Sequence, residues 1–153
     1  MEGRYFSNGR YVSNGVQNLI DKTKTQQSME KLIIEKTEST PEVKFIPETG
    51  LFEIEGKIIP EDAGKFFAPI FSWLDNFFPD KQQPIIMRFS LFYYNTSSSK
   101  RVFDIMRRLD AKYLEGCNIT INWEYEDGDE DNMQDGQDFK SMLKIPFNIV
   151  KVL

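Results

Sequence analysis

Two groups of side chains in this sequence could carry chemistry. One is a run of four hydroxyls, Thr96-Ser97-Ser98-Ser99, and the other is a run of acids between residues 122 and 139. The hydroxyls can accept a phosphoryl group from an external kinase, and the acids have the ligand type that divalent cations prefer. There is no histidine and a single cysteine. Histidine-based triads, histidine-ligated metals and a disulfide framework are therefore excluded.

The acidic run contains eight acids and no lysine or arginine. Asp127, Asp129 and Asp131 have the alternating spacing of a calcium loop, but Asn132 stands where the loop needs glycine, and the twelfth position is an aspartate instead of glutamate. The simplest interpretation is a solvated acidic loop over residues 127–138; a second one is an acidic surface, with Asp127 and Asp129, for a basic protein partner. A small carboxylate enzyme that uses a divalent metal at this loop is the less favoured alternative.

The charge of the chain narrows the classes of partner. The net charge is −5 and the isoelectric point is about 4.9, which argues against nucleic acid and against an anionic membrane surface. No stretch approaches eighteen apolar residues, so membrane insertion is not expected. The first residues lack the apolar core of a signal peptide, and a cytoplasmic location is therefore expected.

The four hydroxyls lie between an apolar segment, residues 85–94, and a helical pattern that begins at Lys100. Helix capping by Asn95, Thr96 or Ser97 is the simplest interpretation. One cap needs one residue, however, and four hydroxyls exceed that need. A phosphate at this position adds about −1.5 to −2 charge, which the helix dipole favours together with the neighbouring Lys100 and Arg101. The pattern therefore also suits a reversible phosphoryl switch, on any of the four hydroxyls.

The elements that must position these residues alternate between strands and helices in the order ββ(β)αβαβαβ. The expected elements are strands at 31–36, 43–46 and 51–58, a helix from Pro60 to residue 78, a strand at 85–94, a helix at 100–114, a strand at 119–125, a short helix at 138–143 and a last strand at 147–153. This order predicts one α/β (α+β) domain, with a central mixed β-sheet flanked by helices. Strand 85–94 is nearly all apolar and is expected to be covered on both faces. Residues 1–29 are polar and are expected to form a flexible extension, and residues 30–153 form the domain.

Several of these segments together resemble the SiaC family of bacterial regulatory phosphoproteins, over roughly residues 30–153. The segments that carry the resemblance are Ser39-Thr40-Pro41, Gly56 with Pro60-Glu61, Phe66-Phe67-Ala68-Pro69, Trp73, Tyr94-Asn95-Thr96-Ser97-Ser98-Ser99-Lys100, Trp123-Glu124-Tyr125, the acidic run and Pro146-Phe147. The sequence departs from the family where Ile58-Ile59 precede Pro60, in place of the Ser-Tyr that the family often has.

The resemblance implies a switch protein and not an enzyme, with no cofactor and no metal. Its fold would be similar to that of anti-sigma-factor antagonists of the STAS type. A cognate kinase would phosphorylate Thr96, and a PP2C-like phosphatase would remove the phosphate. The unphosphorylated form would bind and activate a partner such as a diguanylate cyclase, in cyclic di-GMP and biofilm signalling. Asn95, Lys100, Pro60 and Glu61 would belong to the partner-binding surface. A constitutive scaffold, in which the hydroxyls only cap the helix, is the alternative.

Overall fold

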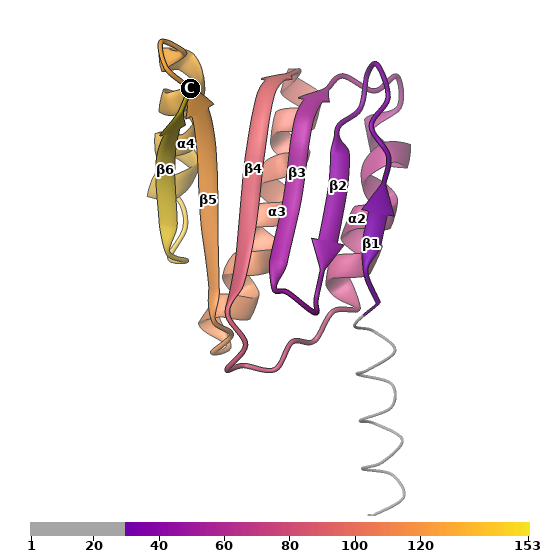
Figure 1. The fold of residues 1–153 in the computed structure, drawn as a ribbon, viewed down its shortest axis with the longest axis vertical. Helices are drawn as coiled ribbons and strands as arrows, with labels where there is room; N and C mark the ends of the chain where they lie inside the picture. The colour runs from indigo at the N-terminus through magenta and orange to yellow at the C-terminus, as the bar shows by residue number, and fades with distance from the viewer. Residues whose placement is uncertain (1–29) are drawn as a thin grey trace, which may run out of the picture. The chain divides into compact units, whose positions relative to one another are not determined.

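Six strands form one mixed sheet in the sequential order β1-β2-β3-β4-β5-β6 (Figure 1). The computed structural model describes residues 30–153, so the predicted extension over residues 1–29 lies outside the described residues. The strands are β1 (Leu32–Ile34), β2 (Glu42–Ile46), β3 (Leu51–Ile58), β4 (Ile85–Tyr94), β5 (Ile119–Glu126) and β6 (Phe147–Val152). The helices are α2 (Ala63–Asp75), α3 (Thr96–Leu114) and α4 (Glu130–Ser141). The predicted α/β domain with a mixed sheet is confirmed.

The sheet changes from antiparallel to parallel at β3. Strands β1, β2 and β3 pair antiparallel, and β3, β4, β5 and β6 pair parallel. Each parallel connection passes through a helix, and Figure 1 shows the three helices behind the sheet. In sequential order, crossovers of the usual right-handed sense all fall on the same side. The carboxyl ends of β3, β4 and β5 therefore share the upper edge of the sheet in Figure 1, which we call the carboxyl edge.

The core lies between the sheet and the three helices. Alternate residues of the strands point toward the helices and are fully buried, as in Phe52 and Ile54 of β3 and Met87 and Phe89 of β4. The helices contribute buried residues at helical spacing. These are Phe67, Ile70 and Leu74 of α2, Val102, Ile105, Met106 and Leu109 of α3, and Phe139 of α4. No helix within residues 30–153 is both long and apolar enough to span a membrane.

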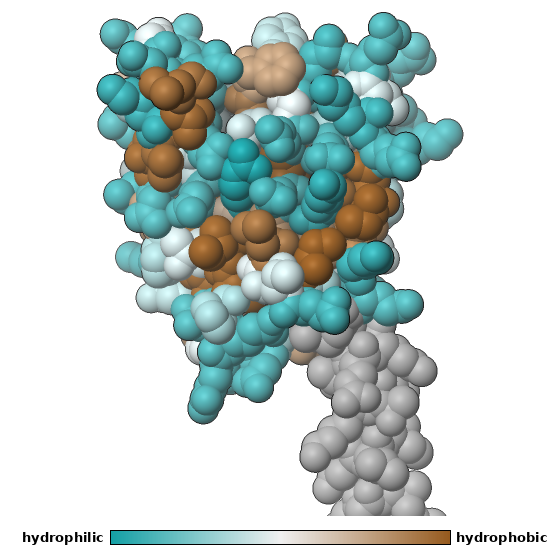
Figure 2. All heavy atoms as spheres, viewed as in Figure 1, coloured by the Kyte–Doolittle hydropathy of each residue, from teal (hydrophilic) through white to brown (hydrophobic). Residues whose placement is uncertain are grey.

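The expectation that residues 85–94 are covered on both faces is wrong. Ile86 and Phe92 of β4 are exposed and Arg88 is half-buried, because they point to the face of the sheet opposite the helices. Within the described residues nothing covers that face, which we call the open face (Figure 2). Arg88, the one charged residue of this apolar strand, is the sequence signal that one face of β4 meets solvent. Exposed apolar residues on the same face, such as Ile86 and Phe92, obscured the alternation of apolar and polar residues.

Boundaries of all three helices differ from the expectation; α3, for example, begins at Thr96 and not at residue 100. Helix α2 begins at Ala63, not at Pro60, because the Asp62 side chain caps it by accepting a hydrogen bond from the Lys65 amide at 3.0 Å. The acidic stretch 127–138 is mostly helix α4 instead of a loop. Asp129 caps α4 through the Asn132 amide, and two more acids lie in its first turn, where the helix dipole favours negative charge.

Candidate functional site

The residues predicted to act in partner binding and switching all follow the carboxyl ends of parallel strands. Pro60 and Glu61 follow β3, Thr96 follows β4 and Asp129 follows β5. Their strands are neighbours in the sheet, so the topology brings these residues to the carboxyl edge. The amide of Asn95 donates to the Ile58 carbonyl at 3.4 Å, which joins the ends of β3 and β4 directly.

Asn95 is the cap of helix α3. Its backbone is extended, and its side-chain oxygen accepts a hydrogen bond from the Ser98 amide at 2.8 Å. Capping is therefore performed by Asn95, and the Thr96 and Ser97 side chains are not needed for it. Thr96 becomes the first residue of the helix, where the free amides and the helix dipole favour an anion.

The four hydroxyls differ in accessibility. Thr96 and Ser97 are exposed, Ser99 is half-buried, and Ser98 is fully buried with no hydrogen-bond partner for its Oγ. The Ser97 hydroxyl accepts a hydrogen bond from Arg101 Nη1 at 2.8 Å. The Thr96 hydroxyl has no hydrogen-bond partner within residues 30–153. Burial of Ser98 removes it from the surface that an enzyme could reach, and Thr96 is the exposed hydroxyl that no contact occupies.

Two cations lie one helical turn beyond these hydroxyls. Lys100 is exposed and stands four residues after Thr96, so the two share one face of α3. Arg101 donates a hydrogen bond to the Ser97 hydroxyl. Its guanidinium also lies beside the first turn of α2, because a methyl group built on Gly64 would be 3.7 Å from Arg101 Nη2. A dianion on Thr96 would therefore find a helix N-terminus and two cations within side-chain reach.

The end of β4 is also joined to helix α4. Tyr94 donates to Asp135 at 2.5 Å and to the Asn132 Oδ1 at 3.2 Å. Asn132 is buried, and its side-chain amide donates to the Leu91 backbone carbonyl at 2.9 Å. The backbone carbonyl of Asn132 accepts a hydrogen bond from the Trp123 indole at 2.9 Å. Burial, and then the bond to Asp135, raise the pKa of the Tyr94 phenol well above its usual range.

This polar cluster of Tyr94, Asn132 and Asp135 was not predicted from the sequence. A signal does exist. Asn132, Gly136 and Phe139 recur at the spacing of one helix face within a stretch of acids, and all three are buried. Gly136 lies against the indole ring, since a methyl group built on it would be within 2.4 Å of Trp123 Cδ1. The inner face of α4 carries asparagine and glycine in place of large apolar residues, so the usual apolar pattern of an amphipathic helix is not visible in the sequence.

The acids proposed as metal ligands have other contacts. Asp129 caps α4, and Asp127 lies 3.9 Å from Lys151 in an exposed ion pair. Among residues 30–153, no group of three or more acidic or cysteine side chains is placed to hold a metal ion. The carboxylates that do converge are on the open face, around Arg88. Arg88 donates to Glu124 and Glu53 at 2.7 Å each, and the bonds to Glu124 are the main cause that raises the pKa of the guanidinium.

Comparison with known proteins matches this chain to one family of regulatory proteins and to its fold. The model of the SiaC family of regulatory phosphoproteins matches residues 34–152. The structure of SiaC of Pseudomonas aeruginosa superposes with a TM-score of 0.72 at 27% identity, covering 81% of this chain and all of that chain. A chain in the crystal structure of the diguanylate cyclase SiaD in complex with its activator SiaC, from the same organism, gives a TM-score of 0.74 at 28% identity, covering 79% of this chain and 99% of that chain. An uncharacterised protein of Pseudomonas aeruginosa strain UCBPP-PA14 is 29% identical over 121 residues, which are 79% of this chain and 96% of that protein.

Proposed function

Because this chain belongs to the SiaC family of regulatory phosphoproteins, we propose that it is a phosphorylation-controlled adaptor that binds and activates a diguanylate cyclase. SiaC of Pseudomonas aeruginosa is the activator of the diguanylate cyclase SiaD and forms a complex with it. In this proposal the unphosphorylated form binds the cyclase and raises cyclic di-GMP. A cognate kinase adds a phosphate to Thr96, a PP2C-like phosphatase removes it, and the chain itself catalyses no reaction.

The observation that supports Thr96 is its position as an exposed first helical residue whose hydroxyl has no protein partner within residues 30–153. Asn95 already caps the helix, so Thr96 can be modified without loss of the cap. A kinase supplies the catalytic groups for phosphoryl transfer, so the acceptor needs only reach and exposure. The phosphate would place a dianion on the carboxyl edge, where Pro60, Glu61 and Lys100 also lie.

Phosphate mapping tests the modification. The protein is incubated with ATP and a candidate serine/threonine kinase from the source organism, and the modified residue is located by mass spectrometry. Phosphate on Thr96, absent from a Thr96→Ala variant and retained in a Ser97→Ala control, is the expected result. Phosphate on another residue, or none on the wild type, overturns the assignment.

Binding to SiaD, the Pseudomonas aeruginosa diguanylate cyclase that SiaC activates, tests the adaptor role. Thr96→Ala is expected to bind like the wild type, because no contact of the side chain is lost. Thr96→Asp is expected to bind at least about tenfold more weakly, because a carboxylate imitates part of the phosphate charge. Equal binding by the two variants favours the alternative of a constitutive scaffold.

A further inference from the structure

The sheet ends at β6, whose outer side meets no other strand of residues 30–153 (Figure 1). The Ile121 amide donates to the Pro146 carbonyl at 2.9 Å, and the Asp127 amide donates to the Val152 carbonyl at 3.1 Å. Backbone groups of a strand point alternately to its two sides, so the even-numbered residues of β6 face β5. The outward N–H and C=O groups belong to Phe147, Ile149 and Lys151. They form a row of backbone groups that no strand of the described domain pairs.

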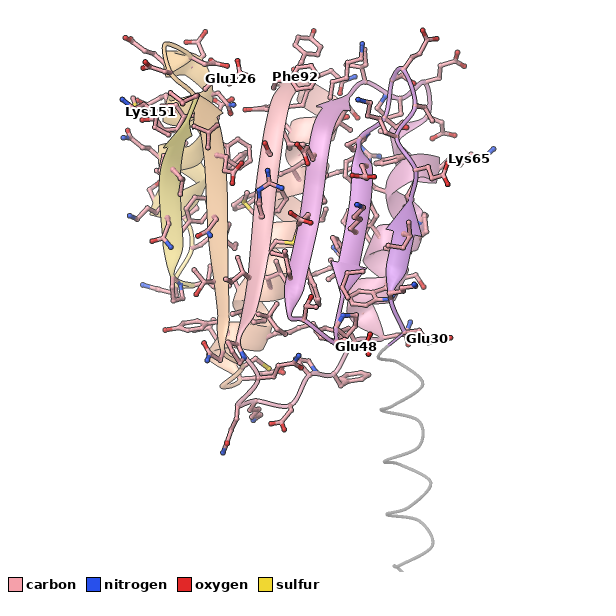
Figure 3. The ribbon with its side chains drawn as sticks, viewed as in Figure 1. Glu30, Glu48, Lys65, Phe92, Glu126 and Lys151 are labelled. Atoms are coloured by element: carbon pink, nitrogen blue, oxygen red, sulfur yellow. The ribbon has the colours of Figure 1, made fainter. Side chains whose placement is uncertain are left out.

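The β6 edge lacks most of the devices that keep a sheet edge unpaired. Those devices are short strands, bulges, proline residues and charges along the strand. The other edge of the sheet, β1, is only three residues long. Strand β6 has six residues, its register with β5 is unbroken, and its one charged residue is Lys151 (Figure 3). An edge of this length and regularity is a template for another strand.

A second copy of β6 would pair all the outward backbone groups at once. Two identical edges related by a two-fold axis pair antiparallel. With the axis at Ile149, this residue pairs with Ile149 of the second copy, and Phe147 pairs with Lys151 of the second copy. Each such pair exchanges two hydrogen bonds, which gives about six backbone hydrogen bonds across the interface. Lys151 then lies opposite an aromatic ring and not opposite another lysine, so like charges do not face each other.

The helices behind the sheet are compatible with this pairing. Helix α4 contacts both β5 and β6, and Figure 1 shows it behind these two strands. In the joined sheet, the α4 helices of the two copies would be separated by about two strand spacings, or roughly 10 Å. Packed helices lie about 8–10 Å apart. A second copy would therefore add contact between helices to the pairing of strands.

The side of α4 that would face the second copy carries few charges. Asp135 accepts a hydrogen bond from Tyr94, so its side of the helix is turned toward β4. The opposite side, toward the outer side of β6, carries Met133, Gln137 and Lys140. Met133 is half-buried, and the other two are exposed. None of the three is acidic, so this side of α4 brings no opposed carboxylates to the interface.

We propose that the outer side of β6 is a self-association surface, at which two copies of this chain join their sheets by antiparallel pairing centred on Ile149. The edge itself selects this occupant, because a second copy supplies the same row of unpaired backbone groups in a self-complementary register. The inference is independent of the proposed adaptor function, since it concerns the protein alone and does not involve Thr96.

Sedimentation equilibrium of the full-length protein tests the association. Lys151→Pro removes one outward N–H, and an edge strand tolerates proline where its N–H faces solvent, so the pairing with β5 remains. Lys151→Ala is the matched control, because it loses the same side chain and keeps the N–H. The wild type and Lys151→Ala are expected to form dimers, and Lys151→Pro is expected to raise the dissociation constant at least about tenfold. A monomeric wild type, or equal association of the two variants, overturns the inference.

Cysteine cross-linking tests the register, even if circular dichroism shows that the proline variant does not fold. In this register Asn148 lies opposite Val150 of the second copy, with Cα atoms about 4.5 Å apart, which suits a disulfide. A mixture of Asn148→Cys and Val150→Cys should form a linked dimer on oxidation. Each variant alone places its cysteines about 7–8 Å apart and should link much less. The wild type is the control, since its Cys117 is buried. No linkage in the mixture, or equal linkage in all samples, overturns the inference.

Discussion

The phenol of Tyr94 donates a hydrogen bond of 2.5 Å to the carboxylate of Asp135, and this bond joins the end of β4 to helix α4. Tyr94 is two residues before Thr96, and α4 is built from the acidic run, so the two groups of side chains that suggested chemistry in the sequence are physically connected. Pairing between β4 and β5 ends at Ser90 and Glu124. Beyond that point, side chains replace the strand pairing. The Asn132 side chain donates to the Leu91 carbonyl, and Tyr94 bonds to α4.

Removal of the Tyr94 hydroxyl should destabilise the domain. Tyr94→Phe loses both side-chain hydrogen bonds to α4 and leaves the carboxylate of Asp135 to be solvated again. The expected loss is about 1–2 kcal/mol in the free energy of unfolding, measured by urea denaturation. Tyr93→Phe is the matched control, because Tyr93 is exposed, and it should change stability by less than about 0.5 kcal/mol. Equal effects of the two variants would contradict a structural role for the Tyr94 bonds.

Stability should fall at alkaline pH in a way that depends on Tyr94. The folded state raises the pKa of this phenol above the value of about 10 of an unfolded chain, so the unfolded state loses the proton first. The contribution is fully present below pH 10 and decreases as pH rises above it. Urea denaturation from pH 8 to pH 11 should therefore show the difference between wild type and Tyr94→Phe shrinking above pH 10. A constant difference across this range would disprove the effect.

Two glycine substitutions should change stability in opposite directions. A methyl group at Gly136 would lie 2.4 Å from the Trp123 ring, so Gly136→Ala should force α4 away from the sheet and cost about 1–3 kcal/mol. Gly64 is exposed in the first turn of α2, and a methyl group there meets nothing closer than 3.5 Å. Gly64→Ala should therefore stabilise the domain by up to about 1 kcal/mol. Thermal unfolding of both variants distinguishes the signs.

The ion cluster on the open face should contribute more than an ordinary surface pair. Arg88→Met leaves Glu53, Glu55 and Glu124 close together without a counter-ion, and a loss of about 2 kcal/mol is expected. Lys44→Met removes an exposed pair of 3.7 Å with Glu42 and should cost less than about 0.5 kcal/mol. Chemical denaturation measures both. A smaller loss for Arg88→Met than for Lys44→Met would show that the cluster is not stabilising.

The cap of α3 can be tested apart from the switch. Asn95→Ala removes the acceptor for the Ser98 amide and should destabilise the domain by about 1 kcal/mol, whereas Asn95→Asp keeps an acceptor and should stay close to the wild type. If both variants unfold like the wild type, the first turn of α3 does not depend on this cap. Phosphorylation of each variant by the kinase then shows whether an ordered first turn is needed for recognition of Thr96.

Much of the fold follows from local sequence patterns. Alternation of apolar and polar residues from Leu51 to Ile58 predicts β3, and the structure has the same bounds. Apolar residues at helical spacing predict a helix from residue 100, and the structure has α3 there. The helix begins four residues earlier, at Thr96, because Asn95 caps it and the hydroxyls form its first turn. The acidic run was predicted as a loop because its polar and small residues resemble a solvated segment. Asn132, Gly136 and Phe139 do share one helix face, but two of the three are polar or small, so the apolar pattern that usually predicts a buried face is weak; in the structure this face packs against Trp123.

The candidate site divides in the same way. By itself, the sequence identified the hydroxyls after β4, the cations that follow them and the family resemblance, because residue type and short spacing are local properties. The tertiary structure alone shows which hydroxyls are buried, and it alone brings Pro60, Thr96 and Asp129 to the carboxyl edge. It also exposes Phe92, an extra residue of β4 between the pairs Gly56–Leu91 and Lys57–Tyr93. Burial, strand order and register arise from contacts between residues far apart in the chain, which no local pattern contains.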